Sequence, residues 1–236
     1  MTRPTLVQAP GGPVEVVVHG DGPPVLAVHG SPGGWDQAVA MGRFLREAGF
    51  TVIAPSRPGY LGTPLEGREA IDAQADLHAA LLDALGHERA GVLAWSGGGP
   101  SAYRLAVRHP GRVTAVVAAA AVSGPYEEHQ GAEERLMLHT RPGNWMLRFL
   151  MQHAPEKTVR ATLAAEGDLT DEELRERVAA VLGDPARYEL VMAMAACVAD
   201  RRHRGRGEDN DLAQFAAITT LGLDGVRAPT LVVTGT

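Results

Sequence analysis

Along much of the chain, short apolar runs alternate with segments in which apolar residues recur every three or four positions. The strand-like runs cover residues 25–29, 51–54, 90–95 and 112–121. Segments with the spacing of amphipathic helices cover residues 37–48, 70–85 and 101–108. Two further runs, residues 5–8 and 14–19, flank Pro10-Gly11-Gly12 and predict an opening hairpin. The alternation predicts an α/β fold with a mainly parallel central sheet flanked by helices.

The pattern changes to successive helices between about residue 124 and about residue 221. Thr170 and Glu173 have the spacing of a capping box, and Asp184 before Pro185 is a typical helix start. The sequence therefore predicts an all-helical insertion over residues 125–221. The core would consist of residues 1–124 and 222–236.

The most informative short segment is Leu93-Ala94-Trp95-Ser96-Gly97-Gly98-Gly99-Pro100. It places Ser96 at a bend between a strand and a helix, where a strained backbone exposes the hydroxyl at the carboxyl edge of the sheet. Two positions before and after the serine, Ala94 and Gly98 are small, as a tight turn requires. The N–H groups at the start of the helix would face any negative charge formed there. Ser96 is the candidate nucleophile.

A second segment, His29-Gly30-Ser31-Pro32-Gly33-Gly34, directly follows a predicted strand. With the serine bend, it makes the chain resemble serine hydrolases of the α/β-hydrolase superfamily, in the group that carries His-Gly-x-Pro-Gly. The resemblance extends over residues 14–124 and 222–236, and it implies that the helical insertion is a cap. It also implies an oxyanion hole made by the backbone N–H groups of Ser31 and Gly97. Pro32 has no N–H to donate, which leaves Ser31 as the donor in this loop.

The resemblance implies that Ser96 forms an acyl-enzyme with a carboxylic ester or a related small acyl compound and needs no cofactor. Trp95 is a candidate for the substrate pocket because of its position. Trp145 and Phe149, in an apolar segment of the insertion, would line the pocket or pack the cap onto the core. A proline-iminopeptidase-like amide hydrolase is an alternative, because that group carries a similar His-Gly-x-Pro-Gly-Gly segment.

The base and the acid that would activate Ser96 are not identified. In the superfamily the order is nucleophile, acid, histidine, and the usual positions of the last two fall beyond Thr236. We therefore expect the C-terminal part of the fold to be absent from this chain, which is then a fragment or is completed by a separate polypeptide. Two alternatives stay open. The chain is a non-catalytic ligand-binding module or an inactive fragment, or the base and acid come from the middle of the chain, where the candidates are His129, His139, His153, His203, Glu127 and Glu128.

Composition and charge limit the classes of molecule that the protein is expected to bind. The net charge of −6 argues against nucleic acid and anionic membranes. The basic run at residues 201–206 is interpreted as a solvated turn. The single cysteine, Cys197, excludes an intrachain disulfide, and the nine histidines lack metal-binding spacing. With neither a leader nor a membrane-length apolar run, we expect a cytoplasmic protein. The abundance of Ala, Gly and Arg with few Lys indicates a GC-rich bacterial genome.

Overall fold

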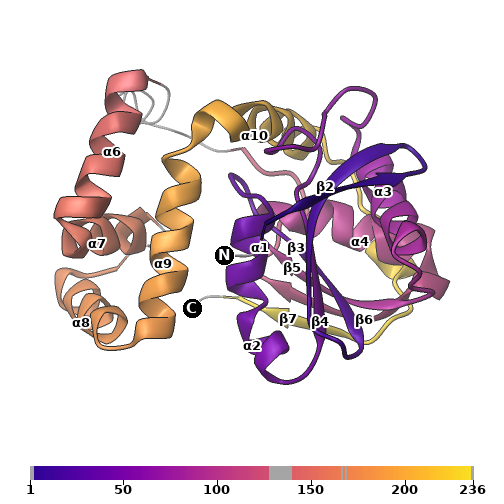
Figure 1. The fold of residues 1–236 in the computed structure, drawn as a ribbon, viewed down its shortest axis with the longest axis horizontal. Coiled ribbons are helices and arrows are strands. Elements are labelled where there is room, and N and C mark those ends of the chain that lie inside the picture. Colours follow the sequence, from indigo (N-terminus) through magenta and orange to yellow (C-terminus); the bar gives the residue numbers. More distant parts are fainter. Residues whose placement is uncertain (1–2, 128–139, 166, 168, 235–236) are drawn as a thin grey trace. The chain divides into compact units, whose positions relative to one another are not determined.

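The computed structural model describes residues 3–127, 140–165, 167 and 169–234, which fall into two compact units. The first unit comprises Met1–Glu128 and His203–Thr236, and the second comprises His129–Arg202. The first unit contains the sheet, and the described part of the second is helical (Figure 1).

The sheet has seven strands in the order β1-β2-β4-β3-β5-β6-β7. The strands are β1 Thr5–Ala9, β2 Gly12–His19, β3 Pro24–Val28, β4 Thr51–Pro55, β5 Ala90–Trp95, β6 Val113–Ala119 and β7 Thr230–Val233. Strands β1 and β2 form the predicted hairpin, with Ala9 paired to Gly12, and β2 runs antiparallel to β4. All pairs from β4 to β7 are parallel, so the predicted α/β fold is confirmed.

The chain reverses its direction of travel across the sheet at β3. It passes from β3 to its neighbour β4 on one side and then to β5 on the other side. The last residues of β3 and β5 therefore lie next to each other, with Val28 paired to Ala94. In open parallel sheets, ligands bind outside the carboxyl ends of the strands at such a switch point.

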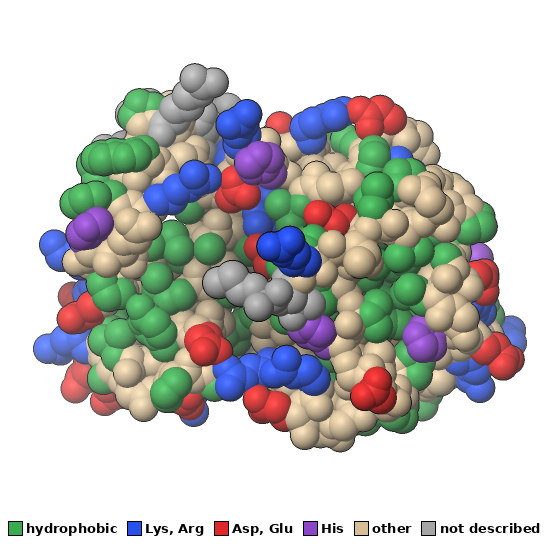
Figure 2. All heavy atoms as spheres, viewed as in Figure 1, with side chains coloured by type: hydrophobic (Ala, Val, Ile, Leu, Met, Phe, Trp, Pro, Cys, Tyr) green, Lys and Arg blue, Asp and Glu red, His purple; other side chains and the backbone are tan. Residues whose placement is uncertain are grey.

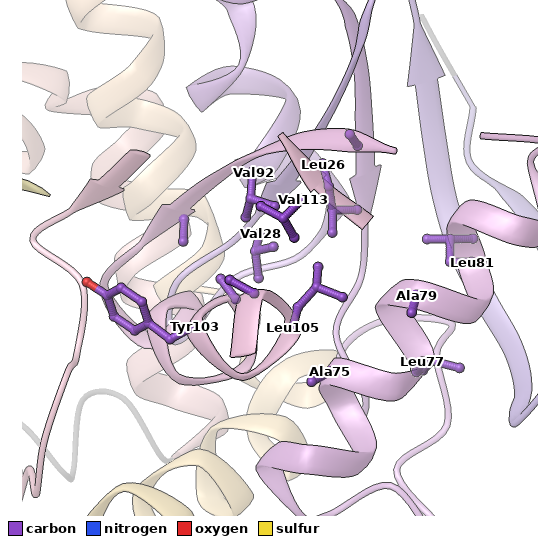
Figure 3. Packing of buried hydrophobic residues seen from close by; sticks show 14 of the residues in the cluster. Leu26, Val28, Ala75, Leu77, Ala79, Leu81, Val92, Tyr103, Leu105 and Val113 are labelled. Atoms are coloured by element: carbon purple, nitrogen blue, oxygen red, sulfur yellow. The ribbon is translucent and has the colours of Figure 1, made fainter. Parts of the chain in front are cut away.

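Helices cover both faces of the sheet. The helices of the first unit are α1 Trp35–Met41, α2 Arg43–Glu47, α3 Ile71–Ala84 and α4 Gly99–Arg108, with most of α10 Arg201–Ala216. The second unit contains α6 Arg141–His153, α7 Pro155–Ala165, α8 Asp171–Leu182 and α9 Pro185–Val198. Alternate residues of β3 point to opposite faces. Leu26 and Val28 join the large core cluster that includes Leu105 of α4 (Figure 3), whereas Ala27 joins a smaller cluster with Ala38 of α1.

The single helix predicted over residues 37–48 is divided in the structure. Helices α1 and α2 meet at Gly42, where a Cβ atom would lie 2.7 Å from Cγ1 of Val52 on β4. The glycine thus lets the chain approach the sheet closely. Its role depends on a contact with a distant strand, so the apolar spacing of residues 37–48 does not reveal the break.

The second unit is built from helices α6 to α9. Its core consists of Val159, Leu174, Val178 and Val181. The predicted capping box is present, with Thr170 and Glu173 bonded reciprocally, and the Asp184 side chain accepts hydrogen bonds from the first turn of α9. In the part of the chain that the structure describes, none of the helices has the length and apolarity needed to cross a membrane.

The chain returns to the first unit at His203, earlier than the predicted boundary after Leu221. The reason is that α10 and the residues after it bury Phe215, Ile218 and Leu221 in the large core cluster of the sheet. The interpretation of residues 201–206 as a solvated turn is wrong. They form the start of α10, and Arg204 is only 4% exposed.

Candidate active site

Ser96 lies at the carboxyl end of β5, in the first position of a short 3-10 helix that leads into α4. Its φ angle is +45°, in the left-handed region that non-glycine residues rarely adopt. The bend requires a glycine two positions later, because a Cβ on Gly98 would lie 2.5 Å from the Val28 carbonyl oxygen. The predicted strand–serine–helix bend is therefore present. Ala94, on the other side, is accommodated in the core.

The loop after β3 brings Ser31 against this bend. A Cβ on Gly97 would lie 2.8 Å from Cβ and 3.2 Å from the backbone nitrogen of Ser31, and a Cβ on Gly30 would lie 3.3 Å from Cβ of Ser96. The glycines thus permit the close approach of the two segments. Within the described residues, the Ser31 N–H has no hydrogen-bond acceptor. The structure brings together the predicted nucleophile and both predicted oxyanion donors.

Side-chain hydrogen bonds hold the loop that contains Ser31, residues 29–34, which we call the oxyanion loop after the role that the sequence predicts for Ser31. The Gly30 N–H donates to Oε1 of Gln37 at 2.7 Å, and Nε2 of Gln37 donates to the Pro32 carbonyl at 3.1 Å. Gln37 is buried and lies on α1. The first helix after the loop therefore fixes the backbone on both sides of Ser31.

His29 is fully buried and uses both ring nitrogens. Its Nε2 accepts a hydrogen bond from the Arg57 N–H at 2.8 Å, so Nδ1 carries the proton and donates to the Gly30 carbonyl at 2.7 Å. Burial and the nearby Arg57 charge lower the pKa of His29 well below its ordinary value. His29 is thus a neutral structural residue of the loop, although it lies one strand away from Ser96.

Arg57, in the loop after β4, connects the oxyanion loop to α10. Its guanidinium donates to the carbonyls of His29 and Gly30 and forms a two-point ion pair with Asp211, with distances of 2.8 and 2.6 Å. Both side chains are almost completely buried. Burial by itself would lower the pKa of Arg57, but the Asp211 carboxylate outweighs that effect and raises it.

Tyr60 completes this connection. Its hydroxyl donates to Oδ2 of Asp211 at 2.5 Å and lies 2.8 Å from the Ser31 hydroxyl. Burial and the negative charge of Asp211 raise the pKa of Tyr60 well above its ordinary value, so the phenol keeps its proton.

A second contact joins α10 to the same loop. Nη1 of Arg204 donates to the Gly33 carbonyl at 2.7 Å, and its guanidinium pairs with Asp36. The sequence interpretation missed Arg204 and Asp211 because their charges suggested solvent exposure. Their periodic spacing with Gly207, Glu208 and Phe215, which places all five on one face of α10, is the signal that could have revealed a buried helix.

The predicted pocket residues are placed as follows. Trp95 is the last residue of β5 and is half-buried, directly before Ser96. Trp145 and Phe149 lie on α6 with their rings stacked 5.6 Å apart, and they are 62% and 42% exposed. Figure 2 shows exposed hydrophobic side chains on the helical unit around the position of α6 in Figure 1. Whether these residues line a substrate pocket stays a prediction.

Among the described residues, no histidine forms a hydrogen bond with the Ser96 hydroxyl. His153 stacks on Phe149 in the second unit, and the backbone carbonyl of His203 accepts from Leu61. Glu127 is exposed, and the other candidates for the base or acid, His129, His139 and Glu128, lie outside the described residues. Within the part that the structure covers, no cluster of three or more potential ligands could hold a metal ion.

The chain is similar to several known proteins. A family model described as alpha/beta hydrolase fold matches residues 23–164. The uncharacterized hydrolase YcgS of Bacillus subtilis (strain 168) is 28% identical over 229 residues, which are 94% of this chain and 77% of that protein. A 2-hydroxymuconate semialdehyde hydrolase of Pseudomonas putida is 32% identical over 117 residues, or 48% of this chain and 42% of that protein.

A solved structure gives a longer match. The alpha/beta hydrolase fold protein from Nakamurella multipartita is 50% identical to this chain, with a TM-score of 0.92. The match covers 97% of this chain and 80% of that one.

Proposed function

The chain belongs to the alpha/beta hydrolase fold family, and its similarity to known hydrolases supports a hydrolase. We propose that it is a serine hydrolase that acts on carboxylic esters or related acyl compounds. The observation that carries this proposal is the left-handed backbone of Ser96 beside Ser31, at the switch point of the sheet. A serine in strained geometry, beside a free backbone donor of a neighbouring loop, is the arrangement used for acyl transfer.

In the proposed reaction, Oγ of Ser96 attacks the carbonyl carbon of the ester and gives its proton to a base. The carbonyl oxygen becomes an oxyanion, which accepts hydrogen bonds from the N–H groups of Ser31 and Gly97. The carbon–oxygen bond to the alcohol then breaks, and the alcohol leaves with the proton. Water then gives a proton to the base and attacks the acyl carbon, the bond from that carbon to Oγ breaks, and Ser96 recovers its proton as the carboxylic acid is released. Removal of one such donor raises the activation free energy by about 3 kcal/mol in comparable sites.

We further propose that the base and acid belong to a segment beyond Thr236, in this polypeptide or a separate one. Two observations support this. His29 and His78 are buried, neutral and already hydrogen-bonded, so they are poor candidates for the base. Strand β7 is exposed along its whole length, although strands of parallel sheets are normally covered on both faces. A further segment would cover it.

The test is covalent labelling with a fluorophosphonate of the protein purified together with the segment proposed to supply the base and acid, followed by peptide mass spectrometry. We expect the label on Ser96, and we expect Ser96→Ala to abolish both the labelling and the hydrolysis of p-nitrophenyl butyrate. Ser123→Ala, which removes an exposed serine hydroxyl, is the matched control and should be labelled normally. Equal hydrolysis by the wild type and Ser96→Ala would refute the proposal.

The same preparation distinguishes the candidate substrates. A proline aryl amide tests the iminopeptidase-like alternative. 2-Hydroxymuconate semialdehyde, the compound in the name of the Pseudomonas putida relative, is the third substrate to compare. A ligand-binding module without catalysis would hydrolyse none of the three and would leave Ser96 unlabelled.

A further inference from the structure

We propose that Asp211 of α10 is a positioning residue for the oxyanion hole. Acting through Tyr60 and Arg57, it fixes the orientation in which Ser31 presents its backbone N–H beside Ser96. This inference rests on the proposed function of Ser96 and Ser31. It assigns a role in the reaction to a helix that sequence patterns had placed in the insertion.

The direction of each hydrogen bond follows from counting hydrogens. Tyr60 has one hydroxyl hydrogen, and its 2.5 Å contact with the acceptor Asp211 uses it. The Ser31 hydroxyl, 2.8 Å from the Tyr60 oxygen, must then be the donor of that bond. The chain of hydrogen bonds therefore runs from Ser31 to Tyr60 to Asp211, and it fixes the rotamer of Ser31.

Asp211 also acts on the backbone just before Ser31. Its carboxylate binds both terminal nitrogens of Arg57, and the same guanidinium donates to the carbonyls of His29 and Gly30. One carboxylate is thus connected to the side chain of Ser31 and to the two preceding peptide groups. Moving it would shift both connections together.

The shape of α10 supports this specific fit. Gly207 lies four residues before Asp211, and a Cβ there would lie 2.3 Å from two ring carbons of Tyr60. The Gly207 N–H also donates to the Gly59 carbonyl at 3.0 Å. Gly207 and Asp211 are one turn apart and therefore lie on the same face of α10. The absence of a side chain at Gly207 lets the Tyr60 ring lie on the helix, at the distance where its hydroxyl meets Asp211.

A purely structural role would not require these charges. Asp211 and Arg57 are each 1% exposed, and buried ion pairs are often replaceable by apolar side chains without loss of stability. Helix α10 is also held by Phe215 in the core and by the Arg204–Asp36 pair. The buried pair adds directional control over the oxyanion loop.

The test compares Tyr60→Phe and Ser31→Ala, which break the Ser31–Tyr60 bond from either end while the Arg57–Asp211 pair remains. We expect kcat for p-nitrophenyl butyrate to fall about tenfold with KM unchanged, because a misplaced oxyanion donor weakens only the transition state. The fluorophosphonate labelling rate should fall in parallel. The double variant should lose no more than Tyr60→Phe alone, because Tyr60→Phe already removes the Ser31–Tyr60 bond together with the Tyr60–Asp211 bond.

Tyr103→Phe, which removes the hydroxyl of a buried tyrosine on α4, is the matched control and should keep the wild-type kcat. Thermal unfolding of each variant separates positioning from stability. Wild-type kcat in Tyr60→Phe, in a protein that Ser96→Ala inactivates, would overturn the positioning role alone. Full activity of Ser96→Ala would instead overturn the proposed function, and the positioning role with it.

Discussion

Two groups of polar and charged side chains connect elements of the first unit, and they differ in their exposure to water. The buried group, Arg57, Tyr60 and Asp211, joins the oxyanion loop to α10. The exposed group links α3 to α4 and consists of Asp72, Asp76, Arg104, Arg108 and His109. The Arg57 and Asp211 side chains are 1% and 2% exposed, whereas those of Arg108 and Asp76 are 36% and 45% exposed.

The difference shows that similar ion pairs serve different purposes. In the exposed group, water screens each pair, and such pairs contribute at most about 1 kcal/mol. In the buried group, each charge has lost its water and depends on its partner, so removal of one partner is costly. The exposed group can lose a member with little effect. The buried group must be complete to be stable.

The largest expected effect is the loss of one buried charge. Arg57→Met leaves the Asp211 carboxylate buried without its cation, and we expect the free energy of unfolding to fall by about 3–5 kcal/mol. Arg57→Met with Asp211→Leu removes both charges and should lose less than the single change. Urea unfolding measures both. If the double variant is as unstable as the single one, the buried charges do not depend on each other.

Acid should act on the surroundings of the buried group before it acts on the exposed group, because His29 and His78 are buried near Arg57. Burial, with the charge of Arg57, lowers the pKa of His78 from 6.5 to about 3, and His29 is also shifted well below 6.5. Both are neutral when folded, so below about pH 6.5 only the unfolded chain takes up their protons. The free energy of unfolding should then fall by up to about 1.4 kcal/mol per pH unit for each histidine.

The carboxylates of the exposed group should matter only in stronger acid. Hydrogen bonds from Arg104 and Arg108 lower the pKa values of Asp72 and Asp76 below 3.8, so the contribution of these carboxylates to stability is lost only as pH falls through those lowered values.

Urea unfolding at pH 7, 6 and 5 measures the fall in stability that the two buried histidines cause. His78→Asn should flatten the slope by one histidine's share, and an unchanged slope would contradict this assignment.

The smallest expected effect is in the exposed group. Arg108→Ala removes its contacts with Asp72 and Asp76, and we expect the free energy of unfolding to fall by about 0.5 kcal/mol. The difference from the wild type should shrink in 1 M NaCl, where charges are screened within about 3 Å. A loss above 2 kcal/mol, insensitive to salt, would remove the contrast between the two groups.

The parts of the molecule that follow local patterns could be predicted from the sequence. Strand β5 has the predicted bounds, and the bend at Ser96 and the approach of Ser31 are found as expected. These depend on apolar periodicity and on small residues at fixed offsets. The same regularity produces the exposed group, because Asp72 and Asp76, like Arg104 and Arg108, are one helical turn apart.

The buried group could not be predicted in this way. Arg57 and Asp211 are separated by 154 positions, and only the folded chain brings them together. The start of α10, residues 201–206, is interpreted from the sequence as a solvated turn because α10 is polar and contains two glycines. Its polar side chains face a polar loop within the fold, so hydrophobicity carries no signal there.

Strand β7 has a consequence for how the protein behaves in concentrated solution. Leu231, Val232 and Val233 are consecutive and all exposed, so apolar side chains project from both faces of the last strand of the sheet. A strand of this kind is a template on which other chains can aggregate. A segment that pairs with β7 would therefore also protect the protein from aggregation. The solubility of the protein at high concentration would depend on whether this one edge of the sheet is covered.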